Sequence, residues 1–123
     1  MRYNELVILK WKIDYYEIQQ GKIPVFDFIE SLNPKAQTKV YNALNLLEEF
    51  GINLGLPHVS KLKGLPLWEL RILGRDNIRI FYVAESGKSF LLLHGFVKKK
   101  QKTDKREIKI ALDRLKDYTQ RKL

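Results

Sequence analysis

Three short apolar segments in the second half of the chain show the clearest pattern of hydrophobic and polar positions. They cover residues 67–73, 78–83 and 90–97, are rich in aromatic and branched side chains, and lie among Gly, Pro, Asn and Asp residues. Segments of this length and composition predict β-strands. Ser86 and Gly87 suit a hairpin turn between the last two segments. We therefore expect a three-stranded meander.

The first half of the chain predicts one more strand and two helices. Residues 10–18 alternate apolar and polar side chains, with aromatic and branched residues that favour a strand beside the meander. Apolar residues recur at helical spacing over 25–32 and predict a short amphipathic helix. A longer helix is predicted over 34–50, because Asn33 suits its start and Gly51 suits its end.

The segment between the long helix and the meander predicts a loop. Residues 52–66 are punctuated by glycine and proline. The loop carries His58, Lys61 and Lys63. We expect it to lean over the sheet face that the helices leave open.

A charged run and a last helix end the chain. Residues 98–102, called the lysine run below, read Lys-Lys-Lys-Gln-Lys and are too polar to pack. Asp104, followed three residues later by Glu107, is typical of a capping box at a helix start. An apolar stripe then continues to Tyr118 on an otherwise charged helix. Together the elements predict one α+β domain spanning residues 1–123.

Alternation along the strands sorts side chains between two sheet faces. One face collects apolar residues such as Trp68, Leu70 and Ile72, and we expect the two helices to pack on it. The residues expected on the other face are Arg71, Arg79, Phe90, Leu92, His94, Phe96 and Lys98. The sheet is thus predicted to have a core on one face and a basic, aromatic surface on the other.

Composition limits the class of protein. A chain of 123 residues can bury a core without disulfides, and this chain has no cysteine. His58 and His94 have no partners at metal-ligand spacing, so we expect no metal and no cofactor. The apolar run within residues 1–10 is too short for a signal peptide or a membrane span. We expect a cytoplasmic protein with no membrane partner.

The positive charge is concentrated in the second half of the chain. Of the net charge of +9, residues 1–57 contribute −1, from six Lys/Arg and seven Asp/Glu, and residues 58–123 contribute +10, from seventeen and seven. Clustered Lys and Arg are typical of proteins that bind a polyanion, because they displace counterions from phosphates. Charge alone also allows a solubilising surface or a patch that docks an acidic protein.

The predicted basic face carries groups that can cleave RNA without a metal. Arg71 and Arg79 can hold a phosphate through paired hydrogen bonds. Phe96 can stack on an unpaired base, which contributes about 1–3 kcal/mol in single-strand binders. His94 can transfer a proton near neutral pH.

The expected reaction is attack of a ribose 2′-hydroxyl on the adjacent phosphate. It needs a base for the 2′ proton, cations for the charge on phosphorus, and an acid for the departing 5′ oxygen. His94 would serve as acid or base. Lys61, Lys63 or Lys98 would share proton transfer or charge neutralisation.

The same residues also allow structural roles. His94 can be a hydrogen-bonded structural residue, and Phe96 can pack at the sheet edge. Arg71 can pair with Glu69 or Glu85. The lysine run can be a solvated linker. The residue pattern by itself leaves these alternatives open.

Parts of the chain resemble the RelE/ParE toxin superfamily, in particular its HigB-like, phage-derived branch. The similar stretches are residues 61–71 (KLKGLPLWELR), 79–82 (RIFY) and 93–99 (LHGFVKK). The resemblance extends over about residues 11–118, with the elements in the same order. It implies a RelE-like fold, in which a mostly antiparallel twisted sheet of about four strands carries two N-terminal helices on one face and a C-terminal helix.

The resemblance also implies a function. It is that of a type II toxin–antitoxin toxin, a ribosome-dependent mRNA endoribonuclease that inhibits translation. The implied partners are a cognate antitoxin of the helix-turn-helix type, the ribosome and mRNA. The implied catalytic residues are Lys61, Arg71, Arg79, His94 and Lys98. The residues implied to bind RNA or the ribosome are Lys63, Phe96, Lys99, Lys100 and Lys102.

Two alternatives come with the same superfamily. Some of its toxins poison DNA gyrase and lack the nuclease residues, and a non-catalytic remnant that binds nucleic acid or an antitoxin is also conceivable. Some relatives carry Tyr where this chain has Phe96, and Phe cannot transfer a proton. Any acid–base role there must shift to His94 or a lysine. The arginines, His94 and the lysine run favour the nuclease.

Overall fold

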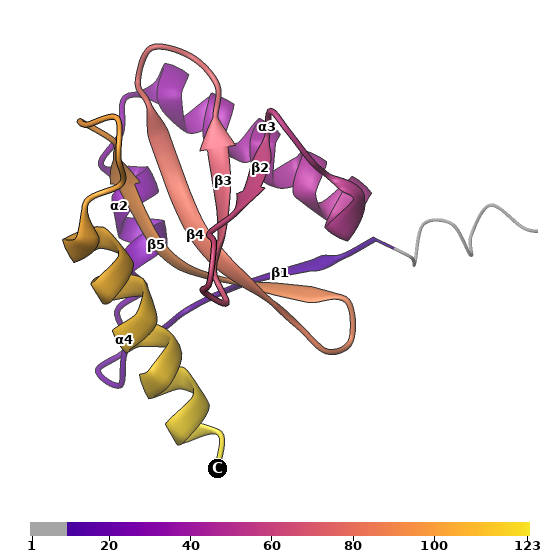
Figure 1. Cartoon of the computed structure of the whole chain (residues 1–123), viewed down its shortest axis with the longest axis vertical. Helices are drawn as coiled ribbons and strands as arrows, with labels where there is room; N and C mark the ends of the chain where they lie inside the picture. Colours follow the sequence, from indigo (N-terminus) through magenta and orange to yellow (C-terminus); the bar gives the residue numbers. More distant parts are fainter. Residues whose placement is uncertain (1–9) are drawn as a thin grey trace, which may run out of the picture.

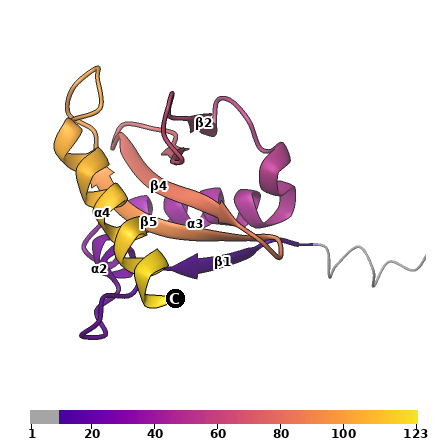
Figure 2. The same ribbon diagram turned by 60° about the horizontal axis from the view of Figure 1, so that its bottom comes forward.

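The computed structural model describes residues 10–123, and within them five strands form one mixed sheet (Figure 1). The strands in spatial order are β1 (Lys12–Tyr15), β5 (Ser89–Val97), β4 (Ile78–Glu85), β3 (Trp68–Ile72) and β2 (Val59–Lys61). β1 runs parallel to β5, and the other neighbours are antiparallel. Figure 2 shows β1 and β2 at opposite edges of the twisted sheet. The α+β class is therefore confirmed.

The expected number of strands was too low, because residues 10–123 contain a strand inside the predicted loop. β2 has three residues, too few to show an alternating pattern, and its pairing with β3 defines it. β1 is shorter than the predicted segment 10–18. The expectation against a signal peptide or membrane span rests on residues 1–9, which lie outside the described part of the chain.

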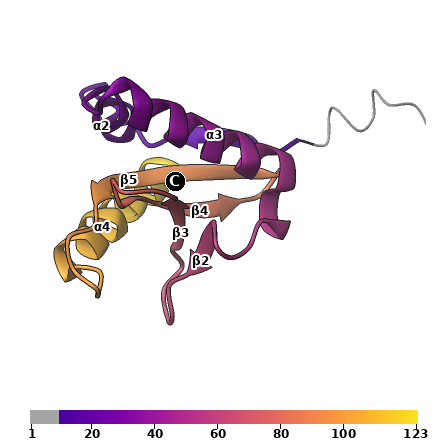
Figure 3. The same ribbon diagram turned by 90° about the horizontal axis from the view of Figure 1, so that it is seen from above.

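The two N-terminal helices form as predicted and cover one face of the sheet, called the helix-pair face below. α2 (Pro24–Glu30) and α3 (Pro34–Phe50) lie together there in Figure 3. The side-chain oxygen of Asn33 caps α3, and Gly51, at a φ of 55°, ends it and begins the short helix η1 (Gly51–Asn53). The buried residues of this core are Val25, Ile29, Ala36, Val40, Ala43, Leu44, Leu47, Val59, Leu70, Ile72, Ile78, Ile80, Tyr82, Phe90 and Leu92.

The last helix, α4 (Lys105–Arg121), covers part of the opposite face, called the α4 face below (Figure 3). A second core lies beneath it, formed by Tyr16, Leu67, Phe81, Val83, Leu91, Leu93, Phe96 and Ala111. The expectation of an open basic, aromatic surface is therefore wrong for the area under α4. The apolar stripe of α4 needs an apolar partner, and the strands supply it. Within residues 10–123, no helix is both long and apolar enough to cross a membrane.

A β-bulge in β5 changes which side chains face α4. The pairing of β4 with β5 shifts at Leu93, which is an extra residue in β5. Phe90 and Leu92 therefore belong to the helix-pair core, and their predicted position on the basic face is wrong. After the bulge, His94 and Phe96 lie on the α4 face as predicted. Simple alternation along the strand could not anticipate this shift.

Candidate functional site

Two arginines lie opposite each other on the α4 face and share one buried carboxylate. Arg71 of β3 and Arg79 of β4 are cross-strand partners. The Nε atom of Arg71 donates to Glu69 Oε1 at 3.1 Å, and the Nε atom of Arg79 lies 3.7 Å from the same oxygen. The Glu69 side chain is 5% exposed. Like charges directly opposite each other destabilise a sheet. The Glu69 carboxylate acts as a counter-ion that offsets the repulsion between the two guanidinium groups.

Arg79 has hydrogen-bonding capacity to spare. Burial lowers its pKa, Glu69 opposes that shift and Arg71 adds to it, yet a guanidinium stays protonated near neutral pH. Its Nη1 atom donates to the Ile78 carbonyl at 3.1 Å. Its Nε atom is buried and has no hydrogen-bond partner within residues 10–123. The Glu69 carboxylate 3.7 Å away compensates the charge near this buried atom, so an anion in the open depression would have to bind the terminal nitrogens of the guanidinium.

Two cavities meet at the lysine run. An open depression of about 450 Å³ is lined by Arg79 and Asn77 together with residues 98–101. A cavity of about 200 Å³ beside the start of α4 is lined by Phe96, Val97, Lys98, Lys99, Lys100, Lys102, Asp104, Arg106 and Glu107. Three lysines of the run border both cavities. The arginine on the sheet and the charged residues of α4 therefore open onto one cationic surface.

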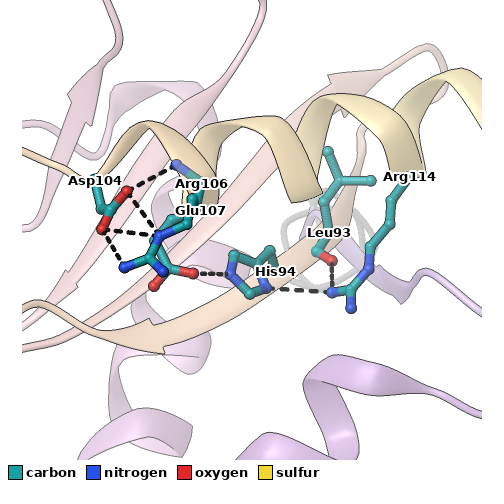
Figure 4. A network of polar contacts seen from close by, with 6 residues as sticks. All are labelled: Leu93, His94, Asp104, Arg106, Glu107 and Arg114. Carbon is teal, nitrogen blue, oxygen red and sulfur yellow. Dashed lines mark hydrogen bonds and ion pairs between the residues drawn. The ribbon is translucent and has the colours of Figure 1, made fainter.

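His94 lies in a polar network beneath α4, which Figure 4 shows from close by. Its Nε2 atom is 2.9 Å from Glu107 Oε1, and its Nδ1 atom is 3.3 Å from Arg114 Nη1. Arg114 Nη1 also donates to the Leu93 carbonyl at 2.9 Å. Because a guanidinium can only donate, Nδ1 accepts and Nε2 carries the proton that it donates to Glu107. The network therefore holds His94 as a neutral imidazole of defined tautomer.

His94 and Phe96 are both largely covered. Burial lowers the pKa of His94, and Arg114 adds to this shift while the hydrogen bond to Glu107 opposes it. The His94 side chain is 11% exposed, and Phe96 is 6% exposed. Their rings stack with centroids 5.4 Å apart, and the Phe96 ring also meets Phe81. In this conformation the ring of Phe96 packs on protein, and both nitrogens of His94 are occupied by α4.

The structure separates the predicted loop lysines from the arginines. Lys61 is the cross-strand partner of Trp68, whose side chain packs on the helix-pair core. The ammonium group of Lys61 lies over the Trp68 ring, 5.8 Å from the centroid, and donates to the Leu65 carbonyl. The expectation that this residue leans over the basic face is therefore wrong. Lys63 is an exposed residue of the β2–β3 turn.

His58 contacts Arg71 through the backbone, since its carbonyl accepts from the Arg71 N–H at 2.8 Å.

The sequence pattern did not place two charged residues of this region, Glu107 and Arg114, at the site. Glu69 was expected only as a structural partner of Arg71 on the same strand face, and it also lies near Arg79. Glu107 and Arg114 were assigned to a helix, but the pattern did not say which sheet face that helix covers. The proposed structural pairing of Arg71 with Glu69 is confirmed, whereas Glu85 instead accepts a hydrogen bond from Tyr118 at 2.6 Å. Within residues 10–123, no cluster of three His, Asp or Glu side chains could hold a metal ion.

Comparison with known proteins gives one family. The family model described as "Phage derived protein Gp49-like" matches residues 27–116, which include both arginines, His94, the lysine run and Arg114. A search of curated proteins finds no match. The match covers most of the chain, from α2 to within α4. The chain therefore belongs to the phage-derived Gp49-like family, a RelE-like family associated with toxin–antitoxin systems.

Proposed function

We propose that the chain is the toxin of a type II toxin–antitoxin pair of the HigB-like branch, and that it cleaves mRNA on the ribosome. The observation that carries the proposal is the position of Arg79. Its guanidinium, held by the Ile78 carbonyl and beside the Glu69 carboxylate, lines an open depression together with the lysine run. A chain of closely spaced phosphates is the ligand that such a surface fits best.

The reaction needs little beyond positioning and charge. Arg79 holds the non-bridging oxygens of the scissile phosphate, and Arg71 and Glu69 fix its direction. The ammonium groups of the lysine run neutralise charge as the 2′ oxygen attacks and phosphorus becomes pentacoordinate. Lys98 is the member of the run closest in sequence to β5, and it borders both cavities. The toxin–antitoxin association of the family supports a cognate antitoxin as partner, and the ribosome would present the mRNA.

Expression of Arg79→Ala in a bacterial host tests this function. We expect loss of growth inhibition, because the variant removes the guanidinium from the depression. Arg75→Ala is the matched control, since Arg75 is an exposed arginine of the β3–β4 turn outside both cavities. Circular dichroism of both purified variants shows whether the fold is kept. If folded Arg79→Ala arrests growth as strongly as wild type while DNA is broken, the gyrase alternative holds instead.

A further inference from the structure

The cavity beside the start of α4 contains one carboxylate that is open on one side. Glu107 lines this cavity together with the lysine run, and its side chain is 26% exposed. Its Oε1 atom accepts the hydrogen bond from His94 Nε2 at 2.9 Å. Its Oε2 atom makes no hydrogen bond or ion pair with any residue in the described range 10–123. One oxygen is thus fixed from behind while the other is free to accept a proton.

The second carboxylate of the cavity is committed elsewhere. Asp104 caps α4 by accepting from the Arg106 N–H at 2.9 Å, and it pairs with the Arg106 guanidinium at 3.0 Å. These hydrogen bonds from Arg106 lower the pKa of Asp104 to about 2. A carboxylate stabilised in this way is a weak proton acceptor. Glu107 is therefore the carboxylate of this cavity that keeps an oxygen without a protein partner in the described range 10–123.

His94 stands behind Glu107, away from the cavity. Its ring bridges Glu107 and Arg114, and Arg114 is anchored in turn on the Leu93 carbonyl, as Figure 4 shows. A ring with both nitrogens occupied does not reach a substrate in the cavity. It does fix the direction of the carboxylate in front of it, as second partners do for catalytic groups in general.

We propose that Glu107 is the general base of the RNA cleavage reaction and that His94 is its positioning residue; this inference rests on the proposed function. The Glu107 carboxylate takes the proton of the ribose 2′-hydroxyl. The 2′ oxygen forms a bond to the adjacent phosphorus, and the bond from phosphorus to the 5′ oxygen breaks. An ammonium group of the lysine run supplies the proton to that oxygen. The products are a 2′,3′-cyclic phosphate and a 5′-hydroxyl end.

The test is single-turnover cleavage of a short synthetic mRNA on purified ribosomes, with the full chain in excess. We expect Glu107→Gln to lower the rate constant about 10²–10⁴-fold, the usual contribution of a general base. The glutamine keeps an oxygen that can accept from His94, so the variant should fold, and its thermal midpoint checks this. Binding to ribosomes that carry a 2′-deoxy mRNA should stay at the wild-type level.

Asp104→Asn is the matched control. It removes the same charge from the same cavity and keeps a side chain that can cap the helix. We expect a rate constant close to that of wild type.

A substrate with sulfur in place of the 5′ oxygen separates base from acid. Sulfur leaves without protonation, so this substrate restores activity to a variant that lacks the acid but not to one that lacks the base. Glu107→Gln should keep its full defect. His94→Gln, which retains a donor toward Glu107, should be more active than His94→Ala.

The possible outcomes separate the two proposals. If wild type cleaves and Glu107→Gln cleaves equally fast, the inference is overturned and the proposed function stands. If the sulfur substrate rescues Glu107→Gln, Glu107 is not the base. If wild type leaves the mRNA intact on ribosomes, the proposed function and this inference are both overturned.

Discussion

Single residues set the chemistry of this surface through their immediate neighbours. Arg71 and Arg79 can stand opposite each other because Glu69 lies between their Nε atoms and is almost fully buried. The sequence left His94 open as an acid, a base or a hydrogen-bonded structural residue, and in the structure it is a neutral imidazole held by Glu107 and Arg114. Alternation along the strands was enough to predict that the two arginines lie on the same sheet face. It could not reveal that a helix occupies both nitrogens of the histidine.

At the scale of one residue, the buried imidazole predicts a pH dependence of stability. Burial lowers the pKa of His94 from its ordinary value of 6.5, so between the folded-state pKa and 6.5 the unfolded chain binds more protons than the folded one. The neutral His94 ring therefore contributes fully to the free energy of unfolding above pH 6.5. This contribution is lost as the pH falls toward and through the folded-state pKa. Chemical denaturation of wild type and His94→Gln between pH 8 and 5 measures it.

We expect the free energy of unfolding of wild type to fall relative to that of His94→Gln as the solution is acidified. His58 is present in both proteins and cancels from the difference. A difference that does not change with pH would show that the ring is not desolvated in the folded state.

The helices cover the two faces of the sheet to different extents. α2 and α3 close the helix-pair face, and α4 closes part of the other face while leaving the arginines and the lysine run beside it. Amphipathic patterns predicted each helix well, and the caps at Asn33 and Asp104 are confirmed. The Glu107 side chain bonds His94 and does not complete the predicted capping box. The side of the sheet on which α4 packs could not be predicted, because apolar side chains lie on both faces of the sheet. The bulge at Leu93 could not be predicted either, because an extra residue within an apolar run does not change its pattern.

At the scale of elements, α2 docks on β5 through Gly95. A Cβ atom at this position would lie 2.5 Å from the Phe28 ring, so Gly95→Ala must displace that ring from the core. We expect a loss of about 1–3 kcal/mol in the free energy of unfolding, as for other overpacked sites. Urea denaturation checks the value. Gly55→Ala is the control, since a Cβ atom there would have no atom within 4 Å. Equal stabilities of the two variants would contradict the close contact between Gly95 and the Phe28 ring.

The whole molecule separates a nearly neutral half from a strongly basic one. Residues 1–57 carry −1 and residues 58–123 carry +10, and the basic half contains the arginines, the lysine run and α4. The first half supplies α2 and α3, which build the core away from the site. Charge distribution in the sequence therefore predicted which half carries the cationic surface. It did not predict the cavities, which depend on how the lysine run folds against α4.

At this scale, changing Lys98, Lys99 and Lys100 together to Gln should weaken binding to ribosomes that carry 2′-deoxy mRNA. Loss of phosphate contacts should also make the dependence of binding on salt shallower, by about 0.7 in the log–log slope for each contact with a single strand. Filter binding at several salt concentrations measures both effects. The matched control changes three exposed lysines elsewhere, namely Lys22, Lys35 and Lys88. Equal effects of the two triple variants would mean that only total charge matters.

Mapping mRNA 5′ ends in a bacterial host after induction of the chain shows whether the protein cleaves translated mRNA. The mapping is done with and without a drug that blocks translation initiation. We expect new ends at in-frame positions that disappear with the drug and are missing when Arg79→Ala is induced. Ends that persist when translation is blocked, or arrested growth with intact mRNA, would contradict a ribosome-dependent nuclease.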